Sequence, residues 1–355
     1  MSVPEDVIRA FLPEVAEFKA APLGSGLIHK TMLVESSEGH HVFQCLNAAV
    51  FPDLEQVMAN IHKVTGAMRE KEESTLHFLS PEGEETFLIT DGSGGVWRCC
   101  VHHPETVTYD VPPSPAHLKN AARAFAKFGQ GLSEAPDLTL HPTIADFHNT
   151  PKRFEAMETA WKTASDERRS MPDYFAIRQS ASSFPEFGLD GLLAPHVPQA
   201  VSHNDTKLNN CLFREGTDEV VCVIDLDTVM EGSWLMDFGD LCRTAICAAP
   251  EDTDDLDEIE VDLDRFRALV EGYADVLKGS VSQAEVHRMV YSVFLLTYEL
   301  ALRFFTDYLQ NDRYFGAKYP EHNLVRTRSQ LTLALKVTAL REPMEEIVQS
   351  AFAPE

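Results

Sequence analysis

Residues 201–213 read VSHNDTKLNNCLF, and residues 221–232 read VCVIDLDTVMEG. Eight positions of the first stretch, between apolar segments, are almost all polar and include His203, Asp205, Lys207, Asn209 and Asn210. In the second stretch, Asp225 follows an apolar run that is typical of a buried strand. Any one of these residues is most often a turn or capping residue. Together, in one short segment, they indicate a functional site.

The two sides of this segment differ in their predicted secondary structure. Up to about residue 104, the sequence predicts a short helix over residues 4–18, two β-hairpins turned by SSEGHH and DGSGG, and one helix that begins after Asp53. Helical periodicity dominates the rest, starting with an apolar face of Leu118, Ala121, Ala122, Phe125 and Phe128 and continuing over residues 151–183, 264–278, 282–310 and 323–340. Two short β-like pieces, residues 211–213 and 220–226, follow the polar segment and interrupt this helical pattern.

These patterns predict an α+β protein of two lobes. We expect a small, β-rich N-terminal lobe of residues 1–104 that binds a nucleotide, and a larger, mainly helical C-terminal lobe of residues 105–355 that carries catalysis and substrate binding. The acidic run over residues 250–264 is expected to be a solvated loop and a helix start, because blocks of like charge repel one another and hydrate.

Composition restricts the partners and the compartment. The chain has 56 acidic and 30 basic residues, a formal charge of −26, so neither nucleic acid nor an anionic membrane surface is an expected partner. Seven cysteines, without a C-x-x-C pair, favour neither a disulfide framework nor a zinc site. The N-terminal residues lack the basic and apolar regions of a signal peptide. We expect a soluble cytoplasmic protein whose oligomeric state the sequence leaves undecided.

The spacing of the polar segment matches the catalytic loop of protein kinases. Asp205 lies two residues after His203 and five before Asn210, and Asp225 follows where a kinase has its metal-binding Asp. Phosphoryl transfer explains each residue type: Asp205 would accept the proton of a substrate hydroxyl, and Asn210 and Asp225 would offer oxygen ligands to Mg²⁺. Lys207 would place a positive charge near the γ-phosphate, and His203 would brace the loop.

These motifs resemble the aminoglycoside phosphotransferase and choline kinase superfamily, with Asn204 in place of a common Gly. Further segments, including GSGLIHKTMLV, IADFHNTPKRF, IDLDTVMEGSWLMDFGDLCR and YELALRFFTDYLQNDRYF, resemble its N-acetylhexosamine 1-kinase branch between about residues 22 and 340. The resemblance implies a bilobal protein-kinase-like fold, and an enzyme that uses ATP and Mg²⁺ to phosphorylate the anomeric hydroxyl of GlcNAc or GalNAc.

The resemblance also implies how the nucleotide would be bound. Gly24, Ser25 and Gly26 would form the loop over the phosphates, and the backbone from Val101 to His103 would face the adenine. Gln44 stands where kinases carry a Lys on the strand after this loop. Its amide can donate a hydrogen bond to a phosphate oxygen but cannot neutralise the phosphate charge.

Two residues are candidates for contact with the acceptor substrate, each with an alternative role. Arg243 can present its guanidinium to sugar hydroxyls or phosphate, or it can form an internal ion pair with Asp237 or Asp240. His148 can lie near the sugar or cap the helix that follows it. The acceptor could instead be choline, homoserine or an aminoglycoside. The protein could also be a non-catalytic nucleotide-binding module, for which Gln44 is the supporting feature.

Overall fold

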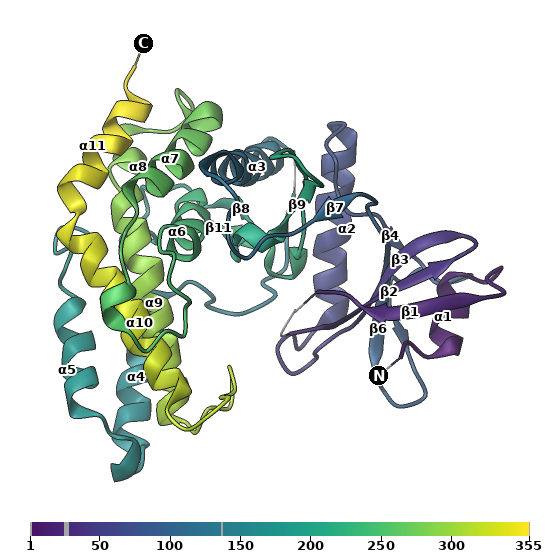
Figure 1. Cartoon of the computed structure of the whole chain (residues 1–355), viewed down its shortest axis with the longest axis horizontal. Helices are drawn as coiled ribbons and strands as arrows, with labels where there is room; N and C mark the ends of the chain where they lie inside the picture. The colour runs from purple at the N-terminus through teal and green to yellow at the C-terminus, as the bar shows by residue number, and fades with distance from the viewer. Residues whose placement is uncertain (1, 25–27, 136–137, 355) are drawn as a thin grey trace. The chain divides into compact units, whose positions relative to one another are not determined.

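The computed structural model of the chain describes residues 2–24, 28–135 and 138–354, and it contains two compact units. The N-terminal unit comprises Met1–Val107, Gly131–Ala145 and Leu212–Met230. The C-terminal unit comprises Thr108–Gln130, Asp146–Cys211 and Glu231–Glu355. Strands dominate the first unit and helices the second (Figure 1), so the predicted α+β class, with a β-rich N-terminal part and a helical C-terminal part, is confirmed.

The N-terminal unit is built on an antiparallel sheet in the order β1-β2-β3-β6-β4, in which β5 also pairs with β6. Its strands are β1 (Phe18–Pro22), β2 (Lys30–Ser36), β3 (Gly39–Cys45), β4 (Phe78–Leu79), β5 (Ile89–Thr90) and β6 (Val96–Val101). Alternate residues of β2 and β3, such as Val34 and Phe43, are buried in a core with α1 (Glu5–Phe11), as expected for strands with one face on the core. Both predicted hairpins, β2–β3 and β5–β6, are present.

Helix α2 (Leu54–Glu70) begins as predicted, because the Asp53 side chain accepts a hydrogen bond from the backbone N–H of Gln56. It packs against the short 3₁₀ turn Leu226–Thr228 of the same unit. A second sheet has the order β10-β9-β7, with β7 (Thr106–Val107), β9 (Cys211–Arg214) and β10 (Val220–Val223).

The C-terminal unit is organised around α9 (Met289–Leu309), which packs against α4, α6 and α10 (Figure 1). The other helices are α3 (Pro115–Ser133), α4 (Thr150–Thr163), α5 (Met171–Ser180), α6 (Trp234–Ala245), α7 (Leu263–Leu277), α8 (Gln283–Val286), α10 (His322–Ala339) and α11 (Arg341–Phe352). A two-stranded sheet consists of β8 (Ala200–Ser202) and β11 (Met230–Gly232). By length and composition α9 could cross a membrane, but 83% of its most apolar window is buried within the protein, as in the core helix of a globular protein.

Several local predictions were wrong. The first helix ends at Phe11 rather than near residue 18, because Leu12 precedes Pro13 and a residue before proline disfavours helical dihedrals. Strand β1 follows instead. Helices α6 and α11 were not predicted, and the helical stretch 151–183 is divided into α4 and α5. The acidic run 250–264 is a loop that leads into α7, as predicted, with Asp262 as the helix cap.

Candidate active site

The polar segment forms the turn between β8 and β9, and the side chain of Asp237 holds its beginning in place. One oxygen of Asp237 accepts from the backbone N–H of His203 at 2.9 Å, and the other accepts from that of Asn204 at 2.7 Å. Thr206 Oγ1 donates to the backbone carbonyl of Asp237 at 2.5 Å. Asp237 lies on α6 and is buried. This helix, which the sequence pattern did not reveal, therefore anchors the predicted catalytic loop.

Asn204, at the position where the superfamily commonly has Gly, has the left-handed backbone conformation, with φ of 65°. Gly adopts this conformation freely, and Asn is among the few other residues that tolerate it. Its side-chain amide donates to the Ser202 carbonyl at 3.1 Å. A Cβ added to Gly232 on β11 would lie 2.5 Å from Asn204 Oδ1, so the strand next to the turn has room for Asn204 only because residue 232 is glycine.

The turn brings Asp205, Lys207, His203 and Asn210 together. Lys207 Nζ lies 2.8 Å from one carboxylate oxygen of Asp205. Asn210 donates its side-chain N–H to the Asp205 carbonyl at 2.8 Å, and the Asp205 N–H donates to His203 Nδ1 at 3.3 Å. The imidazole of His203 is fully buried, with its ring edge-on to Phe125 and Phe128. The ring of His203 therefore contacts both the loop backbone and α3.

The charges of the loop keep Asp205 ionised at neutral pH. Burial alone would raise the pKa of Asp205, but the Lys207 ammonium outweighs it and the pKa is lowered. In turn, although burial opposes the charged form, Asp205 and Asp240 raise the pKa of Lys207 to about 12. An ionised carboxylate is the form that can accept a proton from a hydroxyl.

Asp225 belongs to the N-terminal unit, where it follows β10 in the left-handed conformation, with φ of 61°. The next acidic residue, Asp227, forms a buried ion pair with Arg98 on β6, and both contacts between the guanidinium and the carboxylate measure 2.7 Å. The ion pair lowers the pKa of Asp227 even though burial would raise it. The sequence pattern predicts neither residue of this pair.

Gln44 is part of the same buried network. It lies opposite Arg98 in the register of β3 and β6, and its Oε1 accepts from Arg98 Nε at 2.9 Å. Its Nε2 donates to Thr31 on β2 at 3.2 Å. In this structure the amide predicted to bind phosphate is thus hydrogen-bonded within the sheet at both ends.

The other residues predicted to bind the nucleotide also belong to the N-terminal unit. Gly24 ends the described part of its loop with φ of 71°, a conformation that favours glycine, whereas Ser25 and Gly26 lie outside the described residues. At the predicted adenine-facing segment, the N–H groups of Val101 and His102 donate to the carbonyls of His77 and His40. The carbonyl of His103 accepts from Thr106 Oγ1 at 2.7 Å.

Arg243 makes one of the ion pairs considered from the sequence. Its guanidinium contacts Asp240 at 2.8 Å and Glu251 at 2.9 Å, and its side chain is only 5% exposed. The carboxylate of Asp237 instead accepts a hydrogen bond from the backbone of the catalytic loop. The charges of Asp240 and Arg243 both influence the pKa of Lys207, and Arg243 also lowers the pKa of Asp205, so this network lies near the catalytic loop.

A hollow of about 410 Å³ opens beside Arg243 within the C-terminal unit. Polar and apolar residues of α6, of the acidic loop and of α10 line it: Arg243, Thr244, Cys247, Ala249, Pro250, Glu251, Ile259, Ser329, Gln330 and Leu333. Among the residues that the structure describes, none hydrogen-bonds to the buried Oε1 of Gln330.

His148 does not cap the following helix, so that alternative was wrong. Asn149 is the cap of α4, since its side chain accepts from the Lys152 N–H at 3.2 Å. The imidazole of His148 points instead to the catalytic loop, where Nε2 lies 2.9 Å from the carbonyl oxygen of Asn204. On the other side of the ring, Nδ1 lies 3.0 Å from Oε1 of Glu299 on α9.

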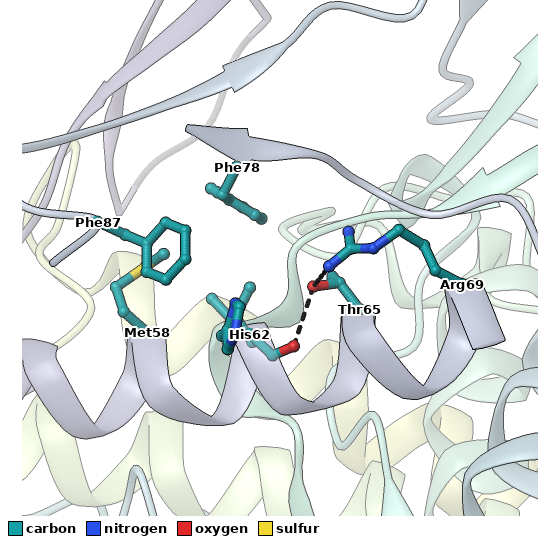
Figure 2. A pocket seen from close by; sticks show the side chains of 7 residues that line it. Met58, His62, Thr65, Arg69, Phe78 and Phe87 are labelled. Atoms are coloured by element: carbon teal, nitrogen blue, oxygen red, sulfur yellow. Dashed lines mark hydrogen bonds between the residues drawn. The ribbon is translucent and has the colours of Figure 1, made fainter. Parts of the chain in front are cut away.

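Another hollow, of about 190 Å³, lies in the N-terminal unit against α2 and contains none of the predicted site residues (Figure 2). The rings of His62 and Phe87 face each other with centroids 4.9 Å apart, and Phe78 lies across from the helix. Arg69 donates to Thr65 Oγ1 at 3.4 Å (Figure 2).

Comparison with solved structures supports the predicted fold. The chain is similar to an aminoglycoside phosphotransferase from Alicyclobacillus acidocaldarius, with 14% identity, a TM-score of 0.62 and 97% of each chain covered. It is similar to a microcompartment-associated aminopropanol kinase, with 15% identity, a TM-score of 0.63 and 99% of each chain covered. A spectinomycin phosphotransferase in complex with ADP and spectinomycin is also similar, with 11% identity, a TM-score of 0.58, and 94% of this chain and 96% of that chain covered.

The protein-kinase-like fold predicted from the sequence is thereby confirmed. The model of the phosphotransferase enzyme family matches residues 19–269, a range that includes the catalytic loop, Asp225 and Arg243. Since this range is well over half of the chain, the protein belongs to the phosphotransferase enzyme family.

Proposed function

We propose that the protein transfers the γ-phosphate of ATP to the anomeric hydroxyl of an N-acetylhexosamine, GlcNAc or GalNAc. The observation that carries the phosphoryl-transfer chemistry is the turn that holds Asp205, Lys207 and Asn210 together, with Asp205 ionised beside the Lys207 ammonium. Family membership supports the reaction class, and the spectinomycin phosphotransferase with bound ADP supports an adenine nucleotide.

In this proposal Asp205 orients the acceptor hydroxyl and takes its proton as the oxygen bonds to the γ-phosphorus. The bond from the γ-phosphorus to the bridging oxygen breaks, and ADP leaves. Lys207 supplies positive charge for the phosphoryl oxygens, while Asp237 and His203 fix the backbone on the N-terminal side of Asp205.

The residues proposed as metal ligands fit Mg²⁺ by their chemistry. Asn210 uses its amide nitrogen for the Asp205 carbonyl, so the amide oxygen is the atom that it can offer to a cation. Asp225 adds a carboxylate, and carboxylate and amide oxygens are the ligands that Mg²⁺ accepts. When bound, Mg²⁺ would neutralise charge on the nucleotide phosphates.

Nucleotide contacts are proposed for the N-terminal unit, with Gly24, Ser25 and Gly26 near the phosphates and the backbone of Val101 to His103 facing the adenine. Gln44 is already hydrogen-bonded to Arg98 and Thr31. A contact between Gln44 and phosphate would require that amide to exchange one of these partners, so we assign the greater part of phosphate neutralisation to Mg²⁺ and Lys207.

A neutral sugar fits the C-terminal unit better than the cationic acceptors that we consider as alternatives. Arg303 lies over the ring of Phe147 and Arg153 donates to the Phe147 carbonyl, so two guanidinium groups lie close to the residue before His148, and burial and the charge of Arg303 lower the pKa of Arg153. A quaternary ammonium or an aminoglycoside would be repelled by this pair of guanidinium groups. The Arg303 guanidinium also lies over the ring of Tyr314, which is 54% exposed and could stack on a sugar.

The hollow beside Arg243 adds a second argument for a neutral, hydroxylated acceptor. Its lining contains both hydrogen-bonding and apolar side chains. Thr244, Ser329 and Gln330 can exchange hydrogen bonds with hydroxyl groups or an acetamido group, while Leu333 and Ile259 provide apolar surface. Arg243 and His148 remain proposed acceptor-side residues, although their fixed partners make indirect roles the better supported ones.

A cytoplasmic location, and the absence of nucleic-acid and membrane partners, are also part of the proposal. The formal charge of −26 and the seven free cysteines support them.

The test is consumption of Mg·ATP with GlcNAc, GalNAc, glucose, galactose, choline, homoserine and kanamycin, with Asp205→Asn run in parallel. We expect turnover with the N-acetylated sugars only, its loss in Asp205→Asn, and a product that carries phosphate on C1. Turnover of a different acceptor would overturn the substrate assignment. ATP binding without turnover of any acceptor would favour the non-catalytic module.

A further inference from the structure

The predicted catalytic loop is held from two opposite sides at one residue. Asp237 on α6 accepts from the N–H of Asn204 at 2.7 Å. In the next peptide group, His148 Nε2 lies 2.9 Å from the Asn204 carbonyl oxygen. Asn204 immediately precedes Asp205 and has a left-handed φ of 65°. The orientation of its carbonyl fixes the direction in which the chain enters Asp205.

The neighbours of the His148 ring determine its protonation. A carbonyl oxygen only accepts hydrogen bonds, so Nε2 must carry a proton to bind Asn204. Glu299 Oε1 faces Nδ1 at 3.0 Å, and Glu299 Oε2 accepts from Thr150 Oγ1 at 2.5 Å. A carboxylate with these two neighbours accepts from both, so Nδ1 carries a proton as well. Both ring nitrogens then donate, which makes the ring an imidazolium.

We propose that His148 and Glu299 form a buried imidazolium–carboxylate pair that positions Asp205 by holding the carbonyl of Asn204. His148 is a positioning residue in this assignment, because it acts through the backbone of Asn204. The inference rests on the proposed role of Asp205 as the catalytic base. It gives His148 a role different from the sugar contact and the helix cap considered from the sequence.

Burial makes this arrangement a strong constraint. The side chains of His148 and Glu299 are only 8% and 2% exposed. A charge-assisted hydrogen bond in such surroundings is shorter and stronger than a neutral one, and an imidazole without its carboxylate would be costly to keep charged there. Asn204 must remain in a backbone conformation that non-glycine residues rarely adopt, and two buried hydrogen bonds to its peptide groups compensate for this strain.

Other charged groups surround the pair. Acidic side chains face the imidazole from α6, namely Asp240 and Asp237, and basic side chains face Glu299 from α9 and α4, namely Arg303 and Arg153. Burial opposes protonation of the ring, but Glu299 and Asp240 outweigh it and raise the pKa of His148 above 6.5. Similarly, His148 and Thr150 lower the pKa of Glu299 against the effect of its burial.

The test measures kcat, and KM for both ATP and the sugar, in His148→Gln, Glu299→Gln and the double variant His148→Gln/Asn204→Gly. We expect His148→Gln to lower kcat by about 10–100-fold, with KM for ATP nearly unchanged, since the loop loses its orientation and not a nucleotide contact. Glycine adopts the left-handed conformation without strain, so Asn204→Gly should restore part of kcat in the His148→Gln background.

The dependence of kcat on pH provides a readout that a purely structural role would not change. Because its neighbours raise the pKa of His148, the imidazolium extends to higher pH than in a free imidazole and is lost as the pH rises through that pKa. The wild-type protein should therefore lose activity at alkaline pH, and Glu299→Gln should shift this loss to lower pH, measured from about pH 6 to about pH 9.

A matched control is His322→Gln, which removes another buried imidazole of the C-terminal unit. His322 is 1% exposed, faces Asp252 at 3.1 Å and accepts from the Lys318 N–H at 3.2 Å, and among the described residues these hydrogen-bond partners lie outside the catalytic loop. It should keep the wild-type kcat and pH profile.

The outcomes separate the two proposals. If Asp205→Asn is inactive but His148→Gln and Glu299→Gln both keep the wild-type kcat and the wild-type loss of activity at alkaline pH, the positioning role is wrong. If Asp205→Asn is active, the proposed function itself fails. If His148→Gln does not fold, kcat and its pH dependence in the isosteric variant Glu299→Gln test the positioning role.

Discussion

Arg98 on β6 and Asp227 after β10 form a bidentate ion pair in which both side chains are only 3% exposed. The carboxylate of Asp227 also lies 3.6 Å from His29 Nε2, and the Nε–H of Arg98 donates to Gln44 Oε1. The pair connects the central part of the sheet to the segment that carries Asp225. The strand position at which kinases place a lysine is thus neutral here, and the buried positive charge lies on the neighbouring strand.

Removing one partner of this pair should destabilise the N-terminal unit strongly. Arg98→Met leaves the Asp227 carboxylate buried without its counter-ion, and Asp227→Asn does the same to the guanidinium. We expect either variant to lose about 3–5 kcal/mol of unfolding free energy, measured by urea denaturation.

The double variant Arg98→Met/Asp227→Leu is the control. It leaves no uncompensated charge and should recover most of the loss. Equal destabilisation in the double variant and in both single variants would show that packing, and not charge pairing, is the main contribution.

The stabilisation by Asp227 should depend on pH in a defined direction. The pKa of Asp227 is lowered in the folded protein, so its contribution is complete above the unfolded pKa of about 3.9 and is lost as the pH falls through the folded pKa. The difference in unfolding free energy between the wild-type protein and Asp227→Asn should be constant at neutral pH and decrease below about pH 4. Urea denaturation at several pH values measures it, and a difference that grew on acidification would contradict the assignment.

Gln44→Lys should weaken the protein although it restores the residue that kinases have at this strand position. A lysine has no acceptor for Arg98 Nε, and it would place a second positive charge beside the guanidinium. We expect a loss of about 1–3 kcal/mol, the typical cost of leaving a buried donor unsatisfied. Gln44→Glu keeps the acceptor and should be tolerated better. Thermal unfolding of both variants checks this order, and a Gln44→Lys protein as stable as the wild type would refute it.

The sequence predicted the features that depend on local spacing. The turn around Asp205 and the cap of α2 by Asp53 are of this kind, since their contacts lie within a few residues. The networks around them join residues far apart in the chain: Arg98 and Asp227 are 129 positions apart, and His148 and Glu299 are 151 apart. The spacing of residues in a single sequence does not indicate which of these distant side chains will meet.

Helix α6 was missed for a related physical reason. Its buried residues include Asp237, Asp240 and Arg243 in addition to apolar residues, so burial along this short helix does not follow side-chain polarity. Those three side chains are satisfied by the catalytic loop and by one another. The buried charged residues of α6 therefore coincide with the candidate active site.

A pair of glycine substitutions should separate close helix packing from helix propensity. A Cβ at Gly272 on α7 would lie 2.3 Å from the carbonyl oxygen of Lys119 and 2.6 Å from the Cβ of Ala122, both on α3. These neighbours are a helix backbone and a short side chain, so they cannot rotate away. Gly272→Ala should force α3 and α7 apart and cost about 1–3 kcal/mol.

Gly66 on α2 is the matched position, because a Cβ there meets nothing within 4 Å. Gly66→Ala should raise the unfolding free energy by about 0.4–1 kcal/mol, since alanine restricts the unfolded chain and favours the helix. The two variants introduce the same methyl group into helices and should shift the urea midpoint in opposite directions. If Gly272→Ala were as stable as Gly66→Ala, α3 and α7 would be able to move apart without losing packing. That result would contradict the prediction, which rests on the close approach of position 272 to the backbone of α3.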